Sequence, residues 1–179
     1  MAKSFSLLGR AASLSVFSVF ISGCFVKGLS YSLPETVLVA TSGPSVFTVD
    51  GSGNGQGHVA TAEGLKLADA SRPAQGGEVV VVYATGLGPV APGVKEGAAA
   101  PAVPLSQTVA EVKATIQGQA AEVQFAGLAP GLAGIYQLNV KVPEGLKADA
   151  SAVLVLSVGE QSASPPVTLA VAGDEKEQP

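Results

Sequence analysis

Polar and apolar residues alternate along much of the second half of the chain. The clearest stretch, 108–117, is apolar at Val112, Ala114 and Ile116 and polar at the positions between them. Successive side chains of a β-strand point to opposite faces, so this period of two residues predicts a strand with one face in the core and the other in water.

Similar stretches recur at a spacing of about ten residues and are separated by Gly or Pro clusters. They occupy 121–125, 134–142, 152–158 and 167–171, with shorter strands expected at 36–40 and 45–49. The run 79–83 is apolar on both faces and predicts a central strand, and Gly118-Gln119 predicts a hairpin turn. This rhythm predicts an all-β fold, an immunoglobulin-like or fibronectin-like antiparallel β-sandwich of about 7 to 9 strands.

Two segments between the predicted strands are expected to be loops. The first, 51–57, is rich in Gly, and the second, 86–106, contains four prolines, which cannot donate ladder hydrogen bonds. Because loops on a rigid scaffold often carry recognition, these two are the expected binding surfaces.

The N-terminal segment has the layout of an export signal. Lys3 and Arg10 precede the apolar run 11–21, which is shorter than the roughly 20 residues of a membrane span and fits a signal-peptide core. The run ends in Ile21-Ser-Gly-Cys24, which resembles the lipobox of bacterial lipoproteins and would make Cys24 the lipidation site. The alternative is a buried first strand in which Cys24 is a small hydrophobic residue.

These patterns divide the chain into four predicted segments. Residues 1–24 are predicted to be a signal peptide, 25–42 a linker or first strand, 43–172 the β-sandwich domain, and 173–179 a charged tail. The expected location is extracytoplasmic, either secreted or anchored in the bacterial cell envelope, with membrane contact only through a lipid on Cys24.

Composition narrows the possible partners. Charged residues make up 13% of the chain and hydrophobic ones 47%, which argues against disorder. The net charge is −4, and removing the segment that holds Lys3 and Arg10 makes it −6. The remaining bases are scattered, so we expect no nucleic-acid partner. Cys24 is the only cysteine, so the domain is predicted to be free of disulfides.

His58 is the only histidine, so any Ser-His-Asp site would be built around it. Its setting predicts the start of a strand, and no partner that would orient a catalytic base is evident. The sequence favours a surface or packed histidine and predicts no catalytic residue.

The segment Asp50-Gly-Ser52-Gly-Asn54-Gly55 matches the first half of a calcium loop. Asp50, Ser52 and Asn54 would be the oxygen ligands, but position 12 is Thr61 rather than the usual Glu. The sequence favours a plain Gly-rich turn, and no metal or cofactor is expected.

Tyr136 lies at the start of a late predicted strand, behind a Gly-rich and Pro-containing turn. This layout predicts a structural tyrosine corner, in which the phenol hydrogen-bonds the backbone a few residues upstream. Leu138 stands where antibody-type domains carry Cys, which favours a sandwich without disulfides.

Six motifs occur together in order over about residues 43–172. They are Pro44-Ser-Val-Phe-Thr48, Gly53-Asn-Gly-Gln-Gly57, Arg72-Pro-Ala74, Val82-Tyr-Ala-Thr-Gly-Leu-Gly88, Phe125-Ala-Gly-Leu-Ala-Pro-Gly131 and Tyr136-Gln-Leu-Asn-Val-Lys-Val-Pro143. This set resembles the Solibacter C-terminal domain family of acidobacterial secreted proteins. The resemblance implies an extracytoplasmic β-sandwich with no established activity.

The sequence therefore predicts a non-catalytic exported accessory domain for binding, adhesion or envelope anchoring. An envelope protein or a glycan is the expected partner, although the lack of Trp weighs against a glycan. Two alternatives stay open: a hydrolase using His58, and a passive C-terminal sorting or spacer module of a truncated larger secreted protein.

Overall fold

The computed structural model describes residues 40–62, 64–159 and 162–173. Contacts divide the chain into Met1–Ala40 and Thr41–Pro179, and all of the described strands belong to the second unit. The predicted signal peptide, Cys24 and most of the predicted strand 36–40 lie outside the described residues.

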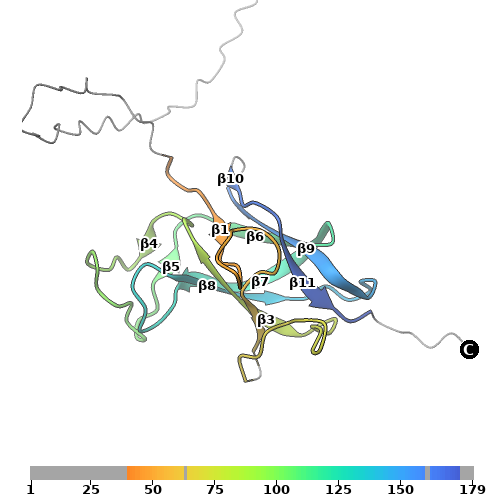
Figure 1. The fold of residues 1–179 in the computed structure, drawn as a ribbon. Helices are drawn as coiled ribbons and strands as arrows, with labels where there is room; N and C mark the ends of the chain where they lie inside the picture. The colour runs from red at the N-terminus through yellow and green to blue at the C-terminus, as the bar shows by residue number, and fades with distance from the viewer. Residues whose placement is uncertain (1–39, 63, 160–161, 174–179) are drawn as a thin grey trace, which may run out of the picture. The chain divides into compact units, whose positions relative to one another are not determined.

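The described residues form eleven strands and no helix (Figure 1). The strands are β1 (Ser45–Val46), β2 (Val59–Thr61), β3 (Val79–Thr85), β4 (Val90–Ala91), β5 (Gln107–Thr108), β6 (Val112–Ile116), β7 (Gln119–Leu128), β8 (Tyr136–Lys141), β9 (Asp149–Val158), β10 (Ser162–Ala163) and β11 (Val167–Val171). Every pair of these strands is antiparallel. The prediction of an all-β, antiparallel fold without disulfides is confirmed.

The strands join into one sheet in the order β1-β3-β8-β7-β6-β9-β10, with the remaining strands paired to its sides. The sheet curls into a half-barrel (Figure 1). The finer expectation, two packed sheets in an immunoglobulin-like arrangement, is not confirmed by this topology.

The bend of the sheet lies within β7. The start of this strand pairs with β6, at Ala121 opposite Ala114, and the remainder pairs with β8. The register shifts between Val123 and Phe125, where an irregularity of the β-bulge kind bends the strand. One long strand therefore serves both halves of the sheet.

Alternation along the strands places the core inside the curl. In β3, Val80 and Val82 are fully buried, and Val82 lies opposite the fully buried Leu138 of β8. Burial of such side chains contributes about 1.5–3 kcal/mol each. β3 lies between β8 on one side and β1 and β2 on the other, so the predicted central strand is confirmed.

Segments outside the sheet cover the free edge of β11. Thr168 N donates to Gly55 O at 2.7 Å, Gly57 N donates to Thr168 O at 2.8 Å, and Ala74 N donates to Ala170 O at 2.9 Å. These contacts bridge the open side of the half-barrel and occupy backbone groups that an exposed edge would offer to other chains.

The hairpin turn between β6 and β7 differs by one residue from the prediction. Gln117 and Gly118 are the central residues, because Ile116 pairs with Gln119. Both have positive φ, 50° and 76°, as a type I′ turn requires. The turn therefore begins one residue earlier than the glycine alone indicates.

Candidate functional site

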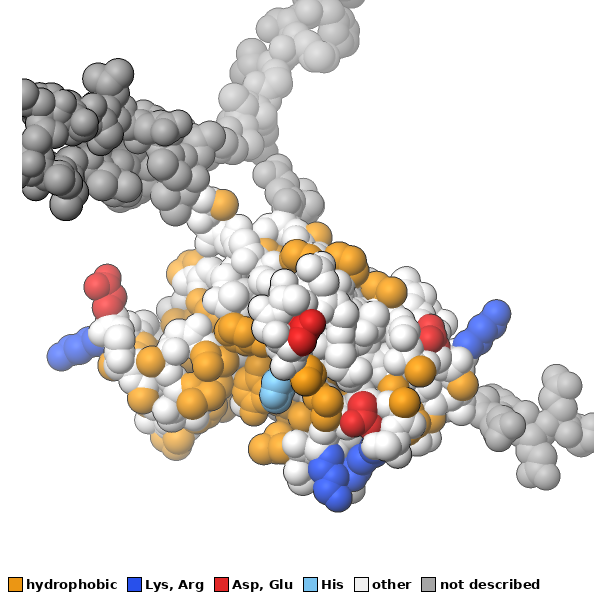
Figure 2. All heavy atoms as spheres, in the orientation of Figure 1, with side chains coloured by type: hydrophobic (Ala, Val, Ile, Leu, Met, Phe, Trp, Pro, Cys, Tyr) orange, Lys and Arg blue, Asp and Glu red, His pale blue; other side chains and the backbone are white. Residues whose placement is uncertain are grey.

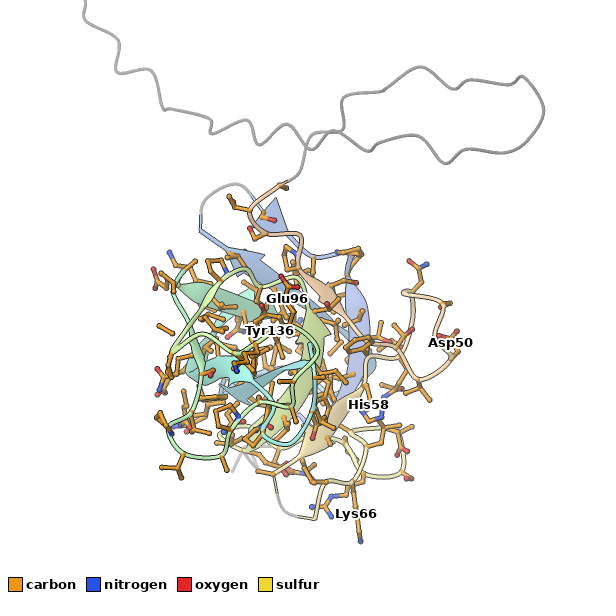
Figure 3. All side chains as sticks on the ribbon, turned by 90° about the vertical axis from the view of Figure 1, so that its left-hand side faces the viewer. Asp50, His58, Lys66, Glu96 and Tyr136 are labelled. Atoms are coloured by element: carbon orange, nitrogen blue, oxygen red, sulfur yellow. The ribbon has the colours of Figure 1, made fainter. Side chains whose placement is uncertain are left out.

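The candidate calcium ligands lie in one exposed turn, but their oxygens bond to groups of that turn. Asp50 Oδ1 accepts hydrogen bonds from Ser52 N at 3.0 Å and from Ser52 Oγ at 2.8 Å. These bonds, led by the backbone one, hold the pKa of Asp50 below its ordinary value. Asn54 N donates to Ser52 Oγ at 3.1 Å. Figure 3 shows Asp50 on its peripheral loop.

The same Asp-x-Ser arrangement occurs at two further places in the described chain. Asp69 Oδ1 accepts from Ser71 N at 2.8 Å and from Ser71 Oγ at 2.6 Å, which lowers the pKa of Asp69. Asp149 Oδ1 accepts from Ser151 N at 2.8 Å. Repetition at unrelated positions favours a structural role for the Asp50 turn, and the expectation that this turn binds no metal stays a prediction.

His58 is exposed and meets an aromatic ring. Its ring lies edge-on to Tyr83, with centroids 5.7 Å apart and an interplanar angle of 76°. Its backbone N donates to Phe47 O at 2.6 Å, and its backbone O accepts from Tyr83 N. Within the described ranges, no group of three or more His, Cys, Asp or Glu residues could hold a metal ion.

Tyr136 makes a long-range contact instead of the predicted local corner. Its phenol donates a hydrogen bond to the carbonyl of Gly88, 48 positions upstream. The ring packs against the core, and burial raises the pKa of the phenol. Figure 3 shows Tyr136 within the body of the fold. The residue thus ties β8 to the beginning of the proline-rich loop.

The proline-rich loop 86–106 is anchored at several points. Leu87 and Ser106 are fully buried, and Ser106 O accepts from Leu128 N at 2.8 Å. Ala100 is 4% exposed, and it exchanges two hydrogen bonds with the turn between β7 and β8: Ala100 N to Leu132 O and Gly131 N to Ala100 O, both 2.9 Å. The loop and this turn therefore form one supported surface.

This surface exposes apolar side chains. Val103 is 88% exposed, Leu132 43% and Leu105 40%, and Pro101 and Pro104 are exposed between them. We call these five residues the apolar loop surface. Figure 2 shows hydrophobic side chains gathered on the side where β4 and β5 lie. Neither 97–110 nor 123–140 contains an ionisable acid or base other than Tyr136, and the nearest charged residues in the loop are Lys95 and Glu96.

A second surface was missed by the sequence reasoning because it depends on strand register. The outer face of β3, β8 and β7 places Tyr83 opposite Gln137, and Asn139 opposite Phe125. All four side chains are partly exposed. We call these four residues the amide-aromatic face. The alternation in 134–142 indicates that Gln137 and Asn139 share a face, but it does not reveal which aromatic residues lie beside them.

Together these features define an antiparallel all-β unit with a supported and partly apolar loop surface. No helix among the described residues has the length and apolar character needed to cross a membrane. Comparison with protein-family models, curated proteins and solved structures finds no match to the chain.

Proposed function

We propose that this protein is a non-catalytic, exported binding module that holds a partner protein of the cell envelope through the apolar loop surface. The observation that carries the proposal is the exposure of Val103 and Leu132 on loops fixed by backbone hydrogen bonds. Contiguous apolar side chains on a soluble surface usually mark an interaction site.

The chemistry of the surface supports a protein partner. The buried centres of protein interfaces are depleted in charge, and the five residues of the apolar loop surface are all uncharged, whereas Lys95 and Glu96 lie elsewhere in the same loop. The anchors at Leu87 and Ala100 limit the entropy that is lost when a partner binds.

Export and family membership belong to the same proposal. The basic and apolar N-terminal pattern supports a signal peptide, and Cys24 supports a lipid anchor. The six ordered motifs support membership in the Solibacter C-terminal domain family, and the antiparallel all-β fold is compatible with an immunoglobulin-like relationship. The hydrolase alternative would need a carboxylate that orients His58 as a general base. The ring contact of His58 is with Tyr83, which has no carboxylate.

The test is capture of envelope proteins by the immobilised full chain. The double variant Val103→Asp and Leu132→Asp places two charges on the apolar loop surface, and we expect at least a tenfold loss of a specifically captured protein. The matched control is Leu65→Asp with Val153→Asp, because these residues are 61% and 44% exposed and belong to other elements, the turn between β2 and β3 and strand β9.

Equal capture by the two double variants would contradict the proposal. Absence of any specifically captured protein would also contradict it and would favour the passive spacer. Thermal unfolding of each variant shows that the fold is kept, because exposed substitutions usually change stability by about 0.5 kcal/mol or less.

A further inference from the structure

We propose that the amide-aromatic face is a second binding site and that its ligand is a neutral polysaccharide. This inference goes beyond the proposed function, because the face is formed by strands rather than by the apolar loop surface. Its basis is the strand register, which brings Tyr83, Gln137, Asn139 and Phe125 onto the same side of the sheet.

The aromatic rings are held in defined orientations. His58 packs edge-on against Tyr83, and Phe47, 41% exposed, adjoins them through the bond from Phe47 N to Tyr83 O at 3.0 Å. Phe125 lies across Gly127, since a Cβ added at Gly127 would be 2.8 Å from Phe125 Cζ. The tip of the ring therefore reaches Gly127 along β7, and the ring is partly exposed.

A hydrogen bond between the side-chain amides of Gln137 and Asn139 fixes their orientation. Gln137 Nε2 donates to Asn139 Oδ1 at 3.0 Å. This bond leaves Gln137 Oε1 as an acceptor and Asn139 Nδ2 as a donor for a ligand. The face thus offers both hydrogen-bonding directions within reach of aromatic surface.

These groups match the chemistry of a sugar ring. One side of a pyranose presents C–H groups that pack on an aromatic ring, and its hydroxyls both donate and accept hydrogen bonds, as primary amides do. An apolar protein surface would bury Gln137 and Asn139 without partners, which costs about 1–3 kcal/mol for each unsatisfied group.

Charge selects neutral glycans over acidic ones. Residues 123–140 carry no Asp, Glu, Lys, Arg or His, and the net charge of the chain is −4. Lys141 follows on the same face of β8, but it lies opposite the acid Glu122 of β7, so the face has no excess of positive charge. A carboxylated or sulfated polymer would therefore be repelled by the protein as a whole.

The inference is tested by affinity electrophoresis of the full chain in gels that contain one polysaccharide each: β-1,4-glucan, mannan or soluble chitin as neutral probes, and polygalacturonate or dextran sulfate as acidic probes. We expect retardation by at least one neutral polymer and by neither acidic polymer. No retardation by any neutral polymer, or equal retardation by the acidic ones, would overturn the inference.

Substitutions on the amide-aromatic face test whether it is the binding site. Tyr83→Ala and Gln137→Ala are expected to weaken binding about tenfold, equivalent to about 1.4 kcal/mol. Asn139→Asp keeps the shape of the side chain but replaces its donor with an acceptor, so it supplies a test if Tyr83→Ala fails to fold. Thr115→Ala, on β6, is the control and should bind as the wild type does.

Retardation of Asn139→Asp and Gln137→Ala equal to that of the wild type would exclude this face as the site. The Val103→Asp and Leu132→Asp variant should keep its polysaccharide binding while losing protein capture. The two experiments can therefore fail separately.

Discussion

At the scale of the residue, Tyr136 connects two segments that are distant in the chain. Its ring packs against the core, and its phenol donates to the carbonyl of Gly88. The proline-rich loop begins directly behind that carbonyl, so this side chain helps to fix where the loop leaves the sheet. A local tyrosine corner would have held only the turn between β7 and β8.

Replacing Tyr136 with Phe should therefore lower the free energy of unfolding by about 1 kcal/mol, since it removes the donor and keeps the ring. Urea denaturation measures the change. Tyr83→Phe is the control, because the Tyr83 hydroxyl makes no side-chain hydrogen bond with the described residues. A loss of the same size in both variants would contradict the role of the Gly88 bond.

The stabilising effect of Tyr136 should also depend on pH. Burial raises the pKa of the folded phenol, whereas the unfolded chain releases this proton near pH 10. Above that pH the folded state binds more protons, so stability falls as the pH rises. The advantage of the wild type over Tyr136→Phe should be full below about pH 10 and shrink above it.

At the scale of the element, the turn between β6 and β7 shows how glycine can fix strand register. Gly118 has a φ of 76°, which residues with a Cβ rarely adopt, and an added Cβ would meet nothing within 4 Å. Any cost of substitution there comes from the backbone rather than from a collision.

Gly118→Ala should lower the free energy of unfolding by about 1 kcal/mol. Gly93→Ala is the matched control, because a Cβ there also meets nothing within 4 Å and its φ is not positive. That substitution should leave stability unchanged or raise it slightly by restricting the unfolded chain. Chemical denaturation of both proteins makes the comparison, and equal effects would contradict the role of positive φ.

Alternation was sufficient to predict the long strands, because side-chain period and burial coincide in them. In β6, Val112, Ala114 and Ile116 are buried, as their spacing indicates. Of the four described two-residue strands, β1 falls within the predicted segment 45–49, whereas β4, β5 and β10 are too short to show a period. Their pairing is set by tertiary contacts, which a local pattern does not contain.

The two candidate surfaces also differ in how much of each could be predicted from local sequence. The proline-rich loop could be singled out from composition, although its anchors could not, because Ala100 and Leu132 meet across separate segments. The amide-aromatic face required the register of β3 against β8, since Tyr83 and Gln137 are far apart in the chain. The hydrogen bond from Tyr136 to Gly88 could not be predicted for the same reason, because the two residues are 48 positions apart.

At the scale of the whole molecule, packing rather than charge stabilises the fold. Among the described residues, Lys113 and Glu111 form an ion pair at 3.8 Å, and both side chains are largely exposed. Exposed pairs contribute about 0–1 kcal/mol. The core that fills the curled sheet therefore has the main stabilising role, and β11 contributes to it while closing the open side.

Leu169→Ala tests this closure, because Leu169 is fully buried on β11. We expect a loss of about 3 kcal/mol from the removed contacts and the cavity that remains. Thr168→Ala, on the partly exposed side of the same strand, should cost less than about 1 kcal/mol. Calorimetric unfolding of the two variants separates these cases, and similar losses would show that β11 is not held by its core contacts.

The bonds that join Gly55 and Gly57 to Thr168 also determine when folding can finish. They link the beginning of the described unit to its last strand, and such non-local contacts slow folding. A chain synthesised from its N-terminus cannot close the curl until β11 has been made. During synthesis, the edges that are covered in the finished molecule stay open, so this interval is when the chain is most exposed to aggregation.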